Sequence, residues 1–393
     1  MAGPLTGYRV LDLTSIVSGP LGTQLLGDQG ADVIKVEPCG TGDLARAGGI
    51  SSAGIASHFV VLNRSKRSLA LNLSEARGKE LLERLIPTAD VFVQNFRPGV
   101  IERIGFGEPQ VRALRPDIVY ASISGFGDTG PLAGKRVYDP LVQAMSGMMY
   151  IQGGMDQPCS MNTIIPDKLT AMMNAQAITA ALLERERSGK GQKISLSMLD
   201  TTIAWMWADS MLPDIWLHDQ TTGKPPMERN NAFKTSDGHI AVCIVSDAEY
   251  QGFCRAADRP DLAKHPKLAS ANDRGSNAPE LFRVLREVLV RDTTANWLER
   301  LNKEDVPAAP LLTLLESISH PQVIENQLVY EREHPHAGRL REVRPSAQFD
   351  RSSMEPGRHA PLLGEHSREV LDEVGVSDAE FEAFVADGIV QTP

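Results

Sequence analysis

The chain has 393 residues, of which 42% are hydrophobic, and a formal net charge of −10 at pH 7. This length is comfortable for two domains, and the negative charge argues against a general nucleic-acid binder, which would present a basic face. No stretch approaches the roughly 20 apolar residues that span a bilayer. The first residues show no signal-peptide pattern, so we expect a soluble, cytoplasmic protein without a membrane partner. The four cysteines, Cys39, Cys159, Cys243 and Cys254, form no CxxC pair and are expected to be reduced thiols with no metal role.

The N-terminal part of the chain alternates between strand and helix patterns. Short apolar runs predict strands at residues 8–14, 31–37, 68–73, 89–95 and 117–123. Amphipathic runs predict helices near residues 19–29 and 75–86, the second with Ser74 as its N-cap, and a short helix that ends near Pro116. Repeated strand and helix units indicate an α/β protein with a parallel, doubly wound sheet, whose ligand lies beyond the carboxyl ends of the strands.

Asp167 stands at the beginning of a long amphipathic run, which Arg185, Arg187 and Gly189 end. An alternating strand follows. We expect the Asp167 carboxylate to be ionised at neutral pH and therefore able to act as a nucleophile without a general base. The alternative is that Asp167 is only an N-cap, which accepts hydrogen bonds from the first free amides of the helix.

The pattern changes after a helix at residues 200–212. Prolines 213, 225 and 226 with Gly223 predict a linker at 213–229, and residues 233–242 predict a hairpin that opens a smaller α/β domain at 230–320. Helices are expected there near 279–291 and 294–302. Residues 321–393 are first polar and proline-rich and then helical at about 366–388.

Two polar motifs in the N-terminal part have more than one interpretation. Arg64, Lys66 and Arg67 could meet a ligand with several phosphates or form a solvated charged surface, and the same holds for Lys135 with Arg136. The segment 125–130 has the glycine spacing of a dinucleotide fingerprint. Pro131 and Gly134 follow where a helix should open, so the segment is interpreted as a turn-rich loop, which disfavours a nicotinamide dehydrogenase.

Several short motifs, in one order along the chain, resemble those of the family III CoA-transferases, also called the CaiB/BaiF family and including formyl-CoA transferases. They are Gly19-Pro20, the run 30–38, Gly42-Asp43 with Arg46, and the runs 63–68, 95–99, 124–131 and 138–139. The likeness extends from residue 5 to the C-terminal end. It implies a Rossmann-like large domain built from both chain ends, with 1–212 as its N-terminal part and 321–393 as a linker and C-terminal return, a small inserted α/β domain, and an interlocked homodimer.

The same resemblance implies an enzyme that moves CoA between an acyl-CoA and a free carboxylic acid, with coenzyme A as a substrate and no permanently bound cofactor or metal. Asp167 matches the catalytic aspartate, which forms a mixed anhydride and then an aspartyl-CoA thioester. Tyr138 and Asp139 match residues beside it and are expected to tune it. The matched CoA contacts are Ile16, Val17, Leu71, Asn72, Leu73, Ser74, Asn95, Phe96, Arg97, Arg103, Arg136, Val137 and Tyr138.

Two departures and two alternatives narrow this hypothesis. Formyl-CoA:oxalate members have glutamine where this chain has Val17, and a glycine run in the second domain where it has only Gly223, which puts oxalate specificity in doubt. The α-methylacyl-CoA racemases of the same fold pair a histidine with an aspartate, whereas here no histidine lies between His58 and His218. A non-catalytic CoA-binding protein would lack the nucleophile, and Asp167 is present. The acids exchanged, the oxyanion donors, the pathway and any contribution of the partner chain stay open.

Overall fold

The computed structural model describes residues 3–212, 215–217, 231–352 and 357–393. The chain divides into two compact units, Met1–Lys224 with Gln327–Pro393, and Pro225–Asn326. The linker expected at 213–229 lies outside the described residues except for 215–217.

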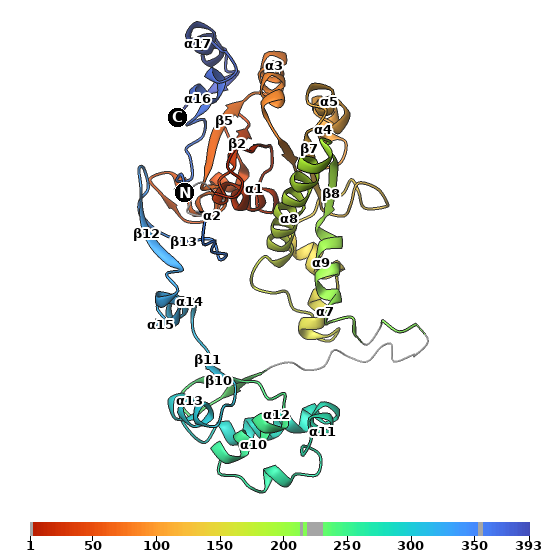
Figure 1. The fold of residues 1–393 in the computed structure, drawn as a ribbon, viewed down its shortest axis with the longest axis vertical. Helices are drawn as coiled ribbons and strands as arrows, with labels where there is room; N and C mark the ends of the chain where they lie inside the picture. The colour runs from red at the N-terminus through yellow and green to blue at the C-terminus, as the bar shows by residue number, and fades with distance from the viewer. Residues whose placement is uncertain (1–2, 213–214, 218–230, 353–356) are drawn as a thin grey trace. The chain divides into compact units, whose positions relative to one another are not determined.

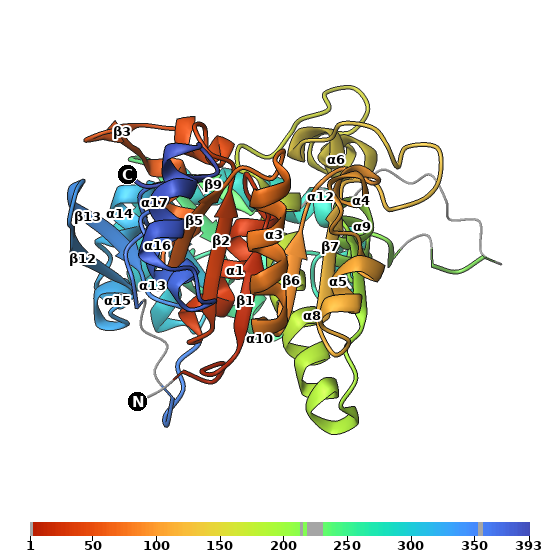
Figure 2. The ribbon, with the colours of Figure 1, turned by 90° about the horizontal axis from the view of Figure 1, so that it is seen from above.

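A seven-stranded sheet forms the centre of the first unit, and Figure 2 shows its strands side by side. Its order is β14-β5-β2-β1-β6-β7-β8. All neighbours are parallel except β14 and β5. The strands are β1 (Arg9–Asp12), β2 (Asp32–Glu37), β5 (Lys66–Leu71), β6 (Val91–Gln94), β7 (Val119–Ser124), β8 (Lys193–Ser197) and β14 (Val390–Gln391). The predicted α/β class with a mainly parallel sheet is confirmed.

Neighbouring apolar residues of each strand point to opposite faces of the sheet, and each face carries its own hydrophobic core. Val10 and Val33 pack with residues of α1 (Ser18–Asp28) and α8 (Ile165–Ser188). Leu11 and Ile34 pack with α3 (Ala76–Leu85), α16 (Ser367–Asp372) and α17 (Asp378–Ala386) on the other face. Because helices cover both faces of this sheet, apolar residues on both faces of its strands are buried.

Helices α1 and α8 lie side by side in Figure 1. Glycine permits this close approach, because a Cβ atom at Gly22 would lie 2.9 Å from the Ala171 carbonyl oxygen and from Asn174 Nδ2. The contact brings the first turn of α8, with Asp167, beside the first turn of α1, with Ser18. Nothing within either helix sequence specifies this pairing.

Charged residues of the early basic motif lie inside the unit. Arg64 forms an ion pair with Asp28 at 2.8 Å, and Lys66 forms one with the β1 carboxylate, Asp12, at 2.9 Å. Arg67 is held by Asp32 at 2.5 Å. All three basic side chains are buried, so this motif provides neither a phosphate site nor a solvated surface; both interpretations of it were wrong.

Shorter elements complete the first unit. They are the 3₁₀ helices η1 (Leu44–Ala47) and η2 (Ile86–Thr88), strands β3 (Ser51–Ser52) and β4 (Ile55–Ala56), and helices α2 (Ser57–Asn63), α4 (Val100–Ile104), α5 (Glu108–Leu114), α6 (Asp139–Met145), α7 (Met148–Gly153) and α9 (Met198–Trp207). The antiparallel hairpin of β12 (Val329–His334) and β13 (Gly338–Val343) lies in the polar, proline-rich segment that begins at residue 321, for which the sequence predicted no strand. Its alternating polar residues gave no apolar strand signal. The N-cap of α3 is Glu75, not Ser74.

The second unit has its own hydrophobic core. The predicted hairpin is present as β9 (Ala232–Lys234) and β10 (His239–Val242), and β11 (Ala308–Pro310) adds a third antiparallel strand. Trp297 is buried there and its Nε1 donates to the Leu289 carbonyl at 2.8 Å. The unit's helices are α10 (Asp247–Ala256), η4 (Leu262–Lys264), α11 (Ala271–Ser276), α12 (Ala278–Leu289), α13 (Thr294–Lys303), α14 (Leu314–Ile318) and α15 (Pro321–Glu325).

Candidate active site

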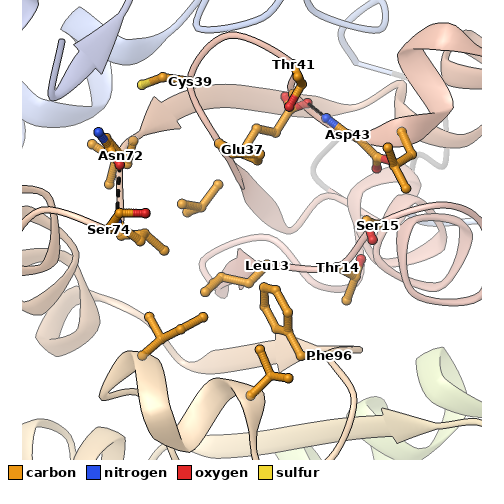
Figure 3. A pocket seen from close by; sticks show the side chains of 18 of the residues that line it. Leu13, Thr14, Ser15, Glu37, Cys39, Thr41, Asp43, Asn72, Ser74 and Phe96 are labelled. Carbon is orange, nitrogen blue, oxygen red and sulfur yellow. Dashed lines mark hydrogen bonds between the residues drawn. The ribbon is translucent and has the colours of Figure 1, made fainter. Parts of the chain in front are cut away.

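A cavity of about 700 Å³ lies at the carboxyl ends of β1, β2 and β5. Figure 3 shows Leu13, Thr14 and Ser15 after β1, Glu37 at the end of β2, and Phe96 after β6 around it. This is the edge at which a parallel sheet with crossover helices binds ligands. The volume falls within the range of about 300–1,000 Å³ of small-molecule sites.

A second cavity, of about 230 Å³, adjoins the first and shares Ser15 and Phe96 with it. Asp167 lines this smaller cavity, together with the segment from Ser15 to Ser18 and the loop before α6.

The structure places every predicted CoA contact around one of the two cavities. Leu71, Asn72, Leu73, Ser74 and Arg103 line the larger cavity, Phe96 lines both, and Ile16, Val17, Asn95, Arg97, Arg136, Val137 and Tyr138 line the smaller one. This grouping is a fact of geometry, and their part in CoA binding stays a prediction.

Asp167 belongs to the first turn of α8, but it does not cap that helix. The N-cap is Ile164, without a side-chain cap bond. Burial, and next the charge of Asp139, raise the pKa of Asp167 to about 6, while hydrogen bonds from the side chain and main chain of Ser18 oppose the rise. The sequence predicted a carboxylate that is ionised at neutral pH. With this pKa about nine tenths of the carboxyl groups are still ionised at pH 7.

Asp139 lies behind the cavity rather than in its wall. It is buried at the first position of α6, its Oδ2 accepts the Asp167 main-chain N–H at 3.2 Å, and its Oδ1 accepts Gln143 Nε2 at 2.6 Å. Gln143 Oε1 in turn accepts the Met161 N–H at 2.9 Å. Asp139 therefore anchors the first turn of α8 and adds negative charge near Asp167. Tyr138 is 57% exposed and lines the smaller cavity.

The loop before α6 rests on the chain that follows β7. A Cβ atom at Gly125 would lie only 1.9 Å from Val137 Cγ1, so glycine is needed for this contact. The next helix after the segment 125–130 is α6, which begins at Asp139. The glycine segment thus serves close packing, which agrees with the prediction of a turn-rich loop.

Unpaired cations line both cavities. In the part of the chain that the structure describes, Arg97, Lys135 and Arg136 of the smaller cavity and Arg103 of the larger one have no carboxylate partner. The two acidic residues of the larger cavity are already engaged: Glu37 by Arg46, and Asp43 by Lys35. The cavities thus attract anions although the chain is acidic overall.

Sequence reasoning did not assign Lys79 to the site. It lines the larger cavity from the first turns of α3. Its position shortly after the predicted CoA contacts Leu71 to Ser74 was the available signal. Gln143, which holds Asp139, was also not assigned; its place four residues after Asp139 in α6 was the available signal.

Within the described ranges, no helix is both long and apolar enough to cross a membrane. The same residues contain no group of three or more histidine, cysteine or acidic side chains that could hold a metal ion.

The fold and the site define an α/β protein with an anion-attracting cleft and one carboxylate at its narrow end. The model of the family described as CoA-transferase family III matches residues 5–367, and the chain belongs to that family.

Its relatives include the mouse (Mus musculus) succinyl-CoA:glutarate CoA-transferase, 33% identical over 99% of this chain and 90% of that protein. The acetyl-CoA:oxalate CoA-transferase of Acetobacter aceti is 36% identical over 83% of this chain and 85% of that protein. The crystal structure of a CaiB/BaiF family protein from Brucella suis is similar with a TM-score of 0.81 and 29% identity, over 95% of this chain and all of the other.

Proposed function

We propose that the protein is a CoA-transferase in which Asp167 is the nucleophile that exchanges CoA between an acyl-CoA and a free carboxylic acid. The observation that carries the proposal is the half-buried Asp167 carboxylate in a cavity whose other charged side chains are the unpaired cations Arg97, Lys135 and Arg136. The larger cavity beside it has room for a nucleotide. CoA would extend from the larger cavity to the smaller one and present its thioester to Asp167.

Each step of the proposed reaction exchanges one reactive acyl bond, a thioester or an anhydride, for another of similar reactivity. An Asp167 carboxylate oxygen adds to the thioester carbonyl, the C–S bond breaks, and a mixed anhydride and CoA thiolate form. The thiolate then attacks the aspartyl carbonyl and expels the donor acid, which leaves an aspartyl-CoA thioester. The acceptor carboxylate attacks this thioester to form a second anhydride and free the thiolate again. Attack of the thiolate on the acceptor's acyl carbon releases the new acyl-CoA and regenerates Asp167.

We propose dicarboxylic acids as the acceptor class. The acids in the names of the two relatives, glutarate and oxalate, both carry a second carboxylate. Arg97, Lys135 and Arg136 supply cations for that group as well as for the CoA diphosphate. Val17 stands where oxalate-specific members have glutamine, so a longer dicarboxylate is favoured over oxalate.

A racemase is the weaker candidate because an acid and base pair must face the carbon next to the thioester. No histidine lines either cavity. We also propose a homodimer, interlocked through the two-unit chain, on the basis of family membership.

The decisive experiment is a mass-spectrometric screen of acyl-CoA donors against mono- and dicarboxylic acids, with wild-type protein and Asp167→Asn. The variant keeps the side-chain volume and is expected to lose CoA exchange while it still binds CoA. Wild-type protein incubated with acyl-CoA should carry a hydroxylamine-sensitive mass adduct on Asp167.

Asp200→Asn is the matched control. Asp200 occupies the first turn of α9 as Asp167 occupies that of α8, and it lines neither of the two cavities. It should retain full exchange. Near-wild-type turnover by Asp167→Asn, with deamidation excluded by mass, would refute the nucleophile assignment. A screen that transfers only to monocarboxylates would refute the acceptor class.

A further inference from the structure

The loop between β1 and α1 contains a backbone conformation that its sequence does not favour. Ile16 has φ +74°, in the left-handed region, although it is β-branched. Such a conformation costs on the order of 1–3 kcal/mol and persists only where the surroundings impose it. Ile16 also lines the smaller cavity, so the strain lies at the proposed reaction site.

Three side chains from other parts of the chain hold the main chain of three successive residues in this loop. Lys35 Nζ donates to the Thr14 carbonyl at 2.9 Å. Asn95 accepts the Ser15 N–H at 2.9 Å and donates to the Ser15 carbonyl at 2.8 Å.

Asp43 makes the contact to the strained residue itself. Its Oδ1 accepts the Ile16 N–H at 2.9 Å and the Ala45 N–H at 2.9 Å, and its Oδ2 forms an ion pair with Lys35 Nζ at 2.8 Å. Both side chains of this pair are buried. A carboxylate is suited to this position because all of its surrounding groups are donors, so a neutral side chain of the same shape cannot satisfy them all.

The loop leads directly to the proposed nucleophile. Val17 is the N-cap of α1 and Ser18 is its first residue. Ser18 lines the smaller cavity together with Asp167, and hydrogen bonding by its side chain and main chain lowers the pKa of that carboxyl group. A change of backbone conformation at Ile16 would move Ser18, two residues later, relative to Asp167.

We propose that Asp43, buried against Lys35, is a positioning residue: it imposes the left-handed conformation of Ile16 and so aims Ser18 at the Asp167 carboxylate. This inference rests on the proposed nucleophilic function of Asp167. It assigns to the ion pair a function in the reaction in addition to its contribution to the fold.

The groups that face Asp167 determine what a misplaced Ser18 would do. Asp139 of α6 contributes a negative charge, and Ser18 of α1 opposes its effect. The other charged or titratable groups lining the same cavity are Arg97, Lys135, Arg136 and Tyr138. Loss of the Ser18 hydrogen bonds leaves burial and Asp139 unopposed, so the pKa of Asp167 should rise above its present value of about 6.

The test is the pH profile of kcat/KM for Asp43→Asn. Asparagine preserves the shape but turns an amide donor toward either Lys35 or the main-chain N–H groups. We expect the acid limb of this profile, which reports the pKa of Asp167, to shift to higher pH by about one unit, because a hydrogen bond to a charged group changes its pKa by about one unit or more. The kcat at pH 6 should fall more than the affinity for CoA.

Asp28→Asn is the control for simple loss of a buried ion pair. Asp28 is as buried as Asp43 and pairs with Arg64 at 2.8 Å, but it makes no contact with the loop 14–18. It should lower thermal stability and leave the acid limb in place. An equal shift in both variants would overturn the proposal.

A rescue experiment tests the strain directly. Glycine adopts positive φ at little cost, so Ile16→Gly combined with Asp43→Asn should return the acid limb toward its wild-type position. Ile16→Gly alone should keep the wild-type limb and raise only KM. If the double variant behaves as the sum of the two single variants, Asp43 does not act through Ile16 and the proposal fails.

A second readout separates this inference from the proposed function. The carboxyl titration of Asp167 can be followed without turnover by infrared difference spectra of each protein minus the same protein with Asp167→Asn. A higher titration midpoint in Asp43→Asn supports positioning even if no CoA transfer is found. An unchanged midpoint refutes positioning even if transfer is confirmed.

Discussion

Removal of Arg103 should weaken acyl-CoA binding more than it slows acyl transfer. Arg103 is in the last turn of α4 and lines the larger cavity with Lys79, whereas Asp167 lines the smaller cavity. It has no carboxylate partner among the described residues, so its guanidinium is free to bind a phosphate oxygen in bidentate fashion. A phosphate changes little during acyl transfer, and such a contact contributes uniform binding, which appears in KM with kcat nearly unchanged.

The expected magnitude is modest because Arg103 is exposed to solvent. A hydrogen bond to a charged group contributes about 1.5–3 kcal/mol, and exposure places this one at the lower end. A loss of about 1.5 kcal/mol corresponds to a roughly tenfold rise in Kd. The effect should decrease at high ionic strength, because the Debye length shortens to about 3 Å at 1 M salt.

Calorimetric titration of CoA into Arg103→Ala measures the effect directly. Titration of the CoA analogue that lacks the 3′-phosphate tells which phosphate is held: the cost of the substitution disappears with that analogue if Arg103 binds the 3′-phosphate and persists if it binds the diphosphate. Arg84→Ala is the control, since Arg84 is an exposed arginine of α3 outside both cavities. Unchanged affinity of Arg103→Ala for both ligands would show that Arg103 is only a surface charge.

Three further outcomes are expected. Asp139→Asn removes the negative charge beside Asp167 but leaves Asp167 buried. The pKa of Asp167, measured as the midpoint of the acid limb of the variant's pH–activity profile, should therefore be lower than about 6 but stay above 3.8. A midpoint at or above the wild-type value would contradict the electrostatic reasoning. Gly125→Ala forces Val137 to move and should cost about 1–3 kcal/mol of stability and lower kcat; thermal unfolding and turnover both equal to wild type would refute the packing argument. The protein should be a homodimer whose midpoint of unfolding rises with protein concentration; light scattering that finds an active monomer would disprove this.

Local patterns in the sequence were sufficient to predict the main elements of the sheet. Apolar runs placed β1 and β2, and the stop signals Arg185, Arg187 and Gly189 placed the end of α8, whose C-cap is Gly189. These signals work because strand and helix periodicity and capping depend on neighbours along the chain. The ordered motifs likewise predicted the family, which the family model and the relatives confirm.

The tertiary structure decided how the site residues act on one another. The raised pKa of Asp167 comes from burial and from Asp139, which α6 brings beside α8, where its carboxylate accepts the Asp167 main-chain N–H. Sequence reasoning named Asp139 as a tuning residue through the resemblance and predicted an ionised Asp167, but it did not predict the burial that raises the pKa of this carboxyl group. Desolvation depends on how the folded chain packs around a group, and this packing cannot be read from the spacing of residues in the sequence.

The same distinction explains the basic motif and the strained loop. Arg64 and Lys66 looked available for a ligand because their carboxylate partners, Asp28 and Asp12, are distant along the chain. The left-handed conformation of Ile16 is opposed by its own residue type and exists because Asp43 is brought beside it. The sequence by itself determined most strands of the large sheet and the longer helices of its unit, whereas the pairing of buried charges and the conformation of the β1–α1 loop depended on contacts between segments far apart in the chain.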